Sequence, residues 1–295
     1  MLGDLLALMW APFLMCLVLT GIHAYLGIHV LAREVVFVDI ALAQIAALGA
    51  TSAFVVGFEL DTWESYVAGL AFTVLGALVL ALTRTRERHV SQEAIIGVVY
   101  AVSSAAAVLV ADRTPHGMEH LRGMLVGSIL SVSGTEVLKV AVLYAAVGVF
   151  HWLCRRPFFL ISTDPAAAFR QGLAVRWWDF LFYASFGVVV TSSVRIAGVL
   201  LVFSYLIVPA LAGIILGGRL ATRLLIGWGF GTGVSLLAMV GSAGLDLPTG
   251  ATVVCAFGLA LLALGVYAKA SGRRAAGPAA LQPLTPLAGA REDRS

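Results

Sequence analysis

Long apolar stretches follow one another along almost the whole chain and are separated by short polar segments. A helix needs about 20 apolar residues to cross a bilayer, and somewhat fewer where it is tilted or buried in protein. The pattern therefore predicts nine membrane-spanning helices within a range of eight to ten, because one stretch is short and residues 124–130 suit an extra short or re-entrant segment. The predicted spans are 5–31, 35–57, 66–82, 93–111, 137–153, 177–190, 196–216, 221–241 and 250–268.

Composition supports this interpretation. Hydrophobic residues make up 60% of the chain, charged residues only 12%, and the mean hydropathy is +0.98, whereas about 25% of the residues of a soluble domain are charged. We predict an all-α, polytopic membrane protein, since a helix satisfies its own backbone hydrogen bonds in lipid. Residues 1–270 would form the transmembrane domain. Residues 271–295, rich in Ala, Gly and Pro, would form a disordered cytoplasmic tail.

The loop charges predict an orientation. One alternating set of loops carries fifteen Lys and Arg residues, the other set carries three, and Lys139 lies at a helix start. Because cytoplasmic loops are rich in Lys and Arg, the N-terminus is expected outside and the C-terminus inside. The net charge of +3 is small, so nucleic acid is not an expected partner, whereas membrane lipid is.

The sequence lacks the residues that ATP hydrolysis and zinc catalysis need. The only lysines are Lys139 and Lys269, and neither lies in a phosphate-binding loop, so the chain is not expected to hydrolyse ATP by itself. The three cysteines are far apart, and no His, Cys or carboxylate spacing matches a catalytic zinc site. We expect no enzyme activity and no cofactor.

Residues 33–49, REVVFVDIALAQIAALG, place Asp39 and Gln44 in an otherwise apolar helix. An ionised side chain at the centre of a membrane helix costs roughly 2.5 to 3.5 kcal/mol on insertion scales. Both side chains should therefore face other helices or a wet cavity, where they either line a pathway or only hold helices together.

The largest loop on the predicted cytoplasmic side contains STDPAAAFRQGL. Asp164 can cap a helix, Pro165 fits its first turn, and Gly172 can end it in the left-handed conformation. The loop thus predicts a short surface helix at about 163–173, either a docking element for a partner or an ordinary loop helix.

Six segments in order resemble the permease subunits of bacterial ABC importers for zinc, manganese and iron. In that family a charged turn leads into Asp-Ala-Leu-Ser-His, and an Asp-Pro loop ends in Gly-Leu. The corresponding segments here are residues 33–49, QEAIIGVVYA at 92–101, GSILSV at 127–132, residues 164–173, RIAGVLLVFSYLIVPA at 195–210 and LDLPTGATVV at 245–254.

The resemblance implies a multi-pass protein of the bacterial inner membrane that works with several partners. A cytoplasmic ABC ATPase would supply ATP hydrolysis, an extracytoplasmic solute-binding protein would deliver the substrate, and two permeases would pair as a homodimer or pseudo-dimer. The loop helix would then couple the permease to the ATPase. The coupling residues would be Asp164, Pro165, Phe169, Arg170 and Gly172.

This sequence departs from the family at the expected metal ligands. Aligned without gaps, the family's Asp falls on Ile40 and its His on Gln44, while Asp39 takes the place of a glycine. Asp39 and Gln44 are five residues apart, or about 140° around a helix. They do not both point directly at one ion, so the family's usual coordination is not expected from this pair.

The preceding helix offers a substitute, since His23 and Gln44 lie at similar depths, as do His29 and Asp39, if the two helices are antiparallel. We predict a substrate pathway formed by these four side chains, with His23 and Asp39 as candidate metal ligands. In the alternative, His29 and Asp39 only pair with each other and His23 is a hydrogen-bonded core residue.

The sequence as a whole predicts the permease subunit of an ATP-driven importer for a divalent transition metal or a metal complex. Three alternatives remain open at this point. The first is the same architecture with a non-metal substrate, the second is an intramembrane enzyme, and the third is a membrane scaffold without transport.

Overall fold

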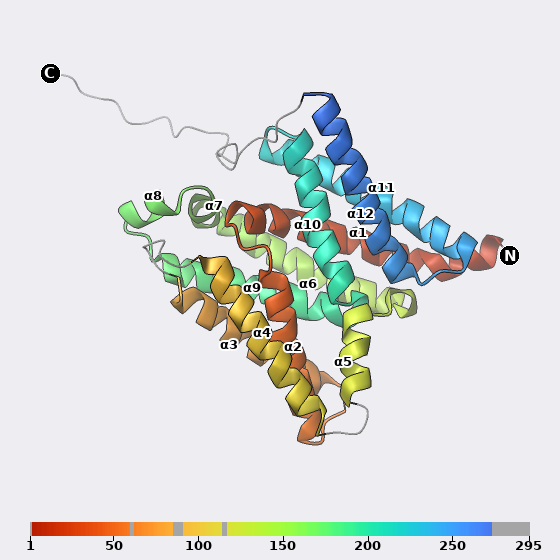
Figure 1. Cartoon of the computed structure of the whole chain (residues 1–295), viewed down its shortest axis with the longest axis horizontal. Helices are drawn as coiled ribbons and strands as arrows, with labels where there is room; N and C mark the ends of the chain where they lie inside the picture. The colour runs from red at the N-terminus through yellow and green to blue at the C-terminus, as the bar shows by residue number, and fades with distance from the viewer. Residues whose placement is uncertain (1, 60–61, 85–90, 114–116, 273–295) are drawn as a thin grey trace.

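The computed structural model describes residues 2–59, 62–84, 91–113 and 117–272 (Figure 1). In these residues all regular structure is helical, and nine helices are long and apolar enough to cross a membrane. The all-α prediction is therefore confirmed. The elements are α1 Leu2–Ala32, α2 Val38–Val55, α3 Trp63–Leu82, α4 Gln92–Ala111, α5 Gly117–Val126, η1 Ile129–Ser131, α6 Gly134–Leu153, α7 Arg155–Thr163, α8 Pro165–Arg170, α9 Val175–Ala197, α10 Val199–Leu216, α11 Leu220–Leu245 and α12 Thr249–Ala270.

The predicted spans match nine of these helices, and the largest difference is in α9. The span 177–190 was expected to end before the polar run that follows it, yet α9 continues to Ala197. Ser192 and Ser193 donate hydrogen bonds to the carbonyl oxygens of Val188 and Val189, at 2.9 and 2.7 Å. Because their hydroxyl groups bond back to the preceding turn, the polar run is compatible with the helix and with the membrane.

Residues 124–130 do not form a span. They end α5 and lead into η1 through Gly127, whose φ is +68°. Gly198, between α9 and α10, has a φ of +78° and lies against Gly127 so closely that a Cβ atom on either residue would overlap the other turn's backbone. Ser128 also donates its N–H to the carbonyl oxygen of Ile196 at 3.1 Å. The two turns thus fix α5 and η1 against α9.

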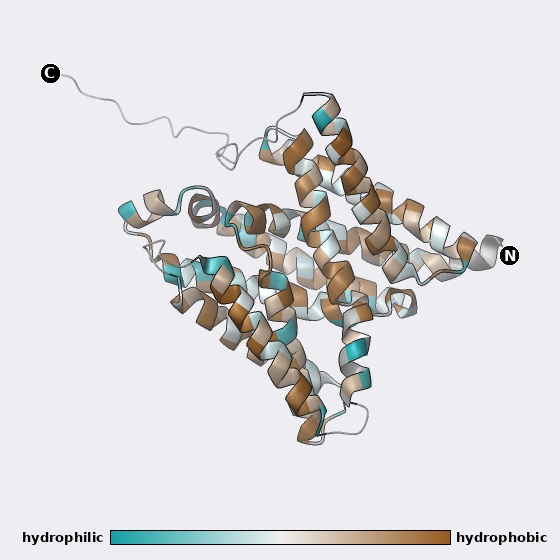
Figure 2. Cartoon of the chain, in the orientation of Figure 1, coloured by the Kyte–Doolittle hydropathy of each residue, from teal (hydrophilic) through white to brown (hydrophobic). Residues whose placement is uncertain are grey.

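The helices are arranged around α1, α6 and α9 (Figure 1). On one side, α2, α3 and α4 pack together, and α3 and α2 contact α9. On the other side, α10, α11 and α12 pack together, and α10 and α11 contact α1. Figure 2 shows apolar residues along the long helices and polar residues mainly at helix ends and on α5. Outer helices such as α12 keep large apolar side chains exposed, which suits a lipid-facing surface.

Two short helices, α7 and α8, connect α6 to α9. The predicted loop helix is present as α8, and an additional helix, α7, precedes it. The predicted tail, except for its first two residues, lies outside the described residues. The orientation in the membrane stays a prediction. We call the end where α1, α3 and α7 stop and α9 begins the inner end, following that prediction.

Candidate functional site

Asp39 and Gln44 lie on α2, in the stretch that the sequence singled out. Asp39 is in the first turn of the helix, is only 2% exposed, and its Oδ1 atom has no hydrogen-bond partner among the described residues. Gln44 is half-buried one and a half turns further on. The N-terminal turn of a helix favours a negative charge, but Asp39 has no cation beside it in the described part of the chain.

His23 lies near the middle of α1 and is fully buried. Its Nδ1 atom is 2.9 Å from the carbonyl oxygen of Leu19, and its Nε2 atom is 3.2 Å from the hydroxyl oxygen of Ser193 on α9. Because a carbonyl oxygen only accepts, Nδ1 carries the hydrogen of the neutral ring. A hydrogen bond between Nε2 and Ser193 then requires the Ser193 hydroxyl to donate to Nε2 instead of to the carbonyl oxygen of Val189.

Two further hydroxyl groups extend this contact toward the outer end. Tyr144 on α6 hydrogen-bonds to Ser193, and the hydroxyl oxygens of Tyr144 and Ser192 lie 3.3 Å apart. We call this chain from Ser192 through Tyr144 and Ser193 to His23 the polar seam. It joins α1, α6 and α9 in the interior of the helix bundle.

His29 lies two turns nearer the inner end, and its partner is not Asp39. Its Nδ1 atom is 2.9 Å from the hydroxyl oxygen of Ser162 on α7. Ser162 donates its only hydrogen to the carbonyl oxygen of Phe158 at 2.8 Å, so it accepts from His29. The His29 ring also packs against Tyr25, with centroids 4.9 Å apart. The structure therefore shows a His29 to Ser162 contact where the sequence allowed a His29 to Asp39 pair.

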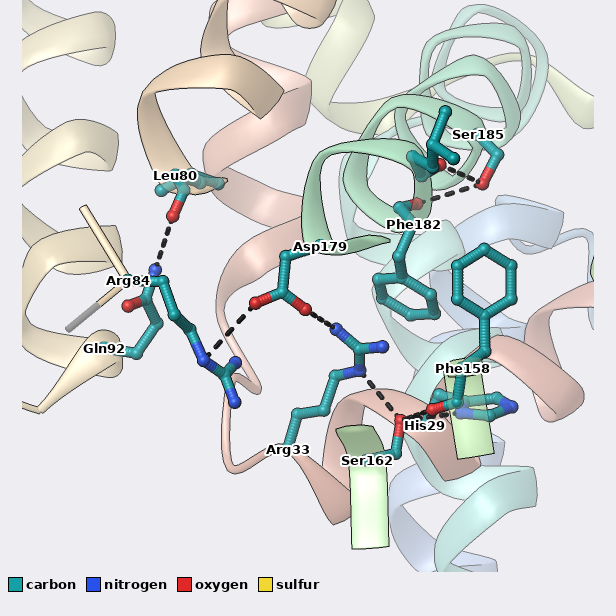
Figure 3. A network of polar contacts seen from close by, with 11 residues as sticks. His29, Arg33, Leu80, Arg84, Gln92, Phe158, Ser162, Asp179, Phe182 and Ser185 are labelled. Atoms are coloured by element: carbon teal, nitrogen blue, oxygen red, sulfur yellow. Dashed lines mark hydrogen bonds and ion pairs between the residues drawn. The ribbon is translucent and has the colours of Figure 1, made fainter. Parts of the chain in front are cut away.

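The same hydroxyl group takes part in a buried ionic network (Figure 3). Arg33, just after α1, donates from Nε to Ser162 at 2.8 Å and pairs from its terminal nitrogen with Asp179 at 2.6 Å. Arg84, just after α3, lies 3.3 Å from the other oxygen of Asp179. The Arg33 guanidinium also lies 3.9 Å from the ring centroid of Phe182. One carboxylate on α9 thus joins the inner ends of α1 and α3, and Ser162 adds α7.

Three of the four predicted pathway residues belong to the residue types that most often bind metals. In the described part of the chain, no group of three or more His, Cys, Asp or Glu side chains is placed to hold a metal ion, so His23, His29 and Asp39 do not form one. The seam residues Tyr144 and Ser193 and the network residue Asp179 were not predicted from the sequence. An aspartate five residues into an apolar span was the available signal for Asp179.

The predicted coupling segment has the local structure that its residues indicated. Asp164 accepts a hydrogen bond from the N–H of Ala167 at 2.8 Å, Pro165 is the first residue of α8, and Gly172 has a φ of +73°. Arg170 lies 3.7 Å from Asp164 in an exposed ion pair. Phe169 is half-buried and packs with the cluster that contains Ile161.

Comparisons with known proteins place the chain among transport proteins. It is 25% identical over 231 residues to a manganese transport system membrane protein, MntC, of Halalkalibacterium halodurans, covering 78% of this chain and 76% of the relative. It is 24% identical over 166 residues to a probable iron transport system membrane protein of Haemophilus influenzae, covering 56% of this chain and 61% of the relative.

Two solved structures share the fold. One is PsaBC from Streptococcus pneumoniae in complex with Fab, with a TM-score of 0.73, 17% identity, and coverage of 90% of this chain and 95% of that one. The other is an inward-facing conformation of a putative metal-chelate type ABC transporter, with a TM-score of 0.64, 20% identity, and coverage of 87% and 86%. The model of the ABC 3 transport family matches residues 6–268. That match spans nearly the whole helical region, so the chain belongs to the ABC 3 transport family, and the resemblance drawn from its motifs is confirmed.

Proposed function

We propose that the chain is the membrane-spanning permease subunit of an ATP-driven importer that moves a divalent transition metal or a metal complex across the bacterial inner membrane. The observation that carries this proposal is the family match over residues 6–268. The nine spans and the relatives named for manganese and iron transport support it.

ATP hydrolysis would come from a cytoplasmic ABC ATPase that docks on α8. This helix is short, capped and exposed at the inner end, and a groove of about 470 Å³ beside it is lined by Phe169, Trp177 and Arg84. Arg84 belongs to the ionic network that also holds α7, α1 and α9. A displacement of α7 and α8 by the ATPase would therefore act directly on these spans and shift the permease between two arrangements.

The other partners follow from the division of labour in such importers. A second permease, identical or related, would complete the pathway, and a solute-binding protein would deliver the substrate at the outer end. The exposed apolar faces of the outer helices leave surface for lipid and for a second permease.

His23, Asp39 and Gln44 remain the residues proposed to line the pathway, together with His29. His23 offers an unprotonated ring nitrogen and Asp39 a buried oxygen without a hydrogen-bond partner among the described residues. Imidazole and carboxylate groups suit first-row divalent metals. Ser193 and Tyr144 would position His23 through the polar seam.

The proposal is tested by reconstituting the chain with its ATPase and binding protein in liposomes and measuring uptake of radioactive manganese, zinc and iron. We expect ATP-dependent accumulation of at least one metal, and a catalytically inactive ATPase as control should abolish it. Absence of ATP-dependent uptake for all three metals, alone or as complexes, would contradict metal import.

The pathway residues are tested in the same liposomes. The double variant His23→Ala, Gln44→Ala should lose uptake, because it removes a candidate ligand on α1 and a proposed pathway residue on α2. The matched control replaces Thr51, a buried residue on α2 whose hydroxyl group bonds, among the described residues, only to Ala47 of its own helix, and Thr51→Ala should keep uptake. Normal uptake by the double variant would remove both residues from the pathway.

A further inference from the structure

Two adjoining hollows open at the outer end between the start of α3, the start of α6, η1 and the end of α9. Their volumes are about 240 and about 550 Å³, and both are lined by Tyr66, Ser128 and Arg195. The larger hollow lies in the range typical of sites for small organic ligands. We call the two together the outer pocket. The larger hollow is further lined by Trp63, Ser131, Glu136, Lys139 and Ser192.

The outer pocket is positively charged. Arg195 and Lys139 both line it, and neither forms an ion pair with another residue of the described ranges. The Arg195 guanidinium lies 5.3 Å from the ring centroid of Tyr66, which also lines the pocket. Bare divalent cations are repelled by two such charges, whereas anions are attracted.

One oxygen of the Glu136 carboxylate in the pocket lining is already engaged. Oε2 of Glu136 accepts hydrogen bonds from the N–H and the hydroxyl group of Ser133, both at 2.8 Å, in the capping box of α6. Glu136 interacts with the charges of Lys139 and Arg195 without contacting them as an ion pair. The lining therefore keeps a net charge of +1 from Arg195, Lys139 and Glu136.

The hydrogen-bond donors of the lining suit a carboxylate. Hydroxyl groups come from Ser128, Ser131 and Tyr66, and the planar guanidinium of Arg195 provides paired N–H donors that match the two oxygens of a carboxylate. Ser192 connects the pocket to the polar seam and so to His23. A ligand in the outer pocket would lie at the entrance of the proposed pathway.

We propose that the outer pocket binds a polycarboxylate, and that the metal enters this permease as an anionic carboxylate complex rather than as a bare ion. An anionic complex would be the substrate class of the importer proposed above, and only the transport step depends on that proposed function. It also fits the replacement of the family's Asp and His positions by Ile40 and Gln44, because a metal that keeps carboxylate ligands needs fewer from the protein.

Binding is measured first, on the full chain in lipid nanodiscs by calorimetry, with citrate as the probe and without any partner subunit. We expect citrate to bind, Arg195→Gln to weaken it by at least about tenfold, and Lys139→Gln by about threefold, because each removes a charge-assisted contact. The citrate affinity of Arg195→Lys should lie between those of the wild type and Arg195→Gln, since lysine keeps the charge and loses the paired N–H donors of the guanidinium. The control Arg122→Gln removes an exposed arginine that does not line the outer pocket and should change affinity less than about twofold.

Two further probes identify the source of the carboxylate. Manganese ion alone should bind to the outer pocket, which Arg195 lines, more weakly than the manganese–citrate complex does. The single carboxylate of N-acetylglutamate amide, which stands for an acidic side chain of a binding protein, should bind more weakly than citrate. Equal affinity for this probe and citrate, no citrate binding, or an equal loss in the Arg122→Gln control would overturn the inference.

The binding results do not depend on transport, so they separate this inference from the proposed function. If citrate binding requires Arg195 but the chain transports no metal, the assignment of the outer pocket stands and the proposed transport function is contradicted. If the chain takes up bare manganese and Arg195→Gln does not change that uptake, the proposed transport function stands and the proposal of an anionic substrate is contradicted.

Discussion

Two buried aspartates near the inner end differ in what surrounds them. Asp179 is fully buried on α9 and lies 2.6 Å from Arg33 and 3.3 Å from Arg84. Asp39 is 2% exposed on α2, and its Oδ1 atom has no hydrogen-bond partner among the described residues. One carboxylate is compensated by two guanidinium groups, and the other depends on the first turn of its helix.

The two carboxylates therefore have different expected roles: Asp179 is structural, and Asp39 is free to take part in function. A buried carboxylate with two cationic partners holds helix ends together, and replacing it leaves those cations uncompensated. A buried carboxylate without such partners is costly to keep, which makes it a functional candidate by default in a membrane protein. The same residue type thus has opposite expected phenotypes at the two positions.

The largest effect is expected from Asp179→Asn. It removes the charge that Arg33 and Arg84 share, and removing one partner of a buried ion pair costs roughly 3 to 5 kcal/mol. Thermal unfolding of the purified chain in detergent should show a markedly lower midpoint and a lower yield of folded protein. If Asp179→Asn unfolds like the wild type, the network is not a structural element and the comparison fails.

A smaller, functional effect is expected from the matched change Asp39→Asn. Its stability should stay within about 1 kcal/mol of the wild type, since no cation loses a partner. ATP-dependent metal uptake should fall by about tenfold, which corresponds to about 1.4 kcal/mol, because a candidate oxygen ligand is weakened. The opposite result, a strong loss of stability with normal uptake, would make Asp39 another structural carboxylate.

The smallest effect on stability is expected from breaking the exposed ion pair of Asp164 by the change Arg170→Ala. Its partner Arg170 lies 3.7 Å away, and their side chains are 52% and 68% exposed. Arg170→Ala should change the free energy of unfolding by less than about 1 kcal/mol, as is usual for surface ion pairs. If α8 couples to an ATPase, the same variant should still lower permease-stimulated ATP hydrolysis; normal stimulation would show that Arg170 is not a coupling contact.

Much of the fold could be predicted because its signals are local. Hydropathy over about 20 residues located nine spans to within a few residues at most ends. Asp164, Pro165 and Gly172 located α8, since capping depends on neighbouring backbone groups. The end of α9 was missed because Ser192 and Ser193 look polar in sequence and are satisfied within the helix.

The candidate site was predicted less completely. The sequence identified His23, His29 and Asp39 as costly groups in the membrane, but it gave no means of choosing their partners. His29 contacts Ser162, 133 residues away, and not Asp39. Depth estimates place residues along the membrane normal, whereas partners also depend on how each helix is rotated and which helices are neighbours.

The sequence by itself determined the membrane class, the helical architecture and the family, because hydropathy, capping and motif order are properties of short segments. Only the tertiary structure decided which polar groups meet. It joined His23 to Ser193 across 170 residues and Arg33 to Asp179 across 146. In lipid the apolar faces are nearly equivalent, so helix packing and interhelical hydrogen bonds, rather than hydropathy, select these contacts.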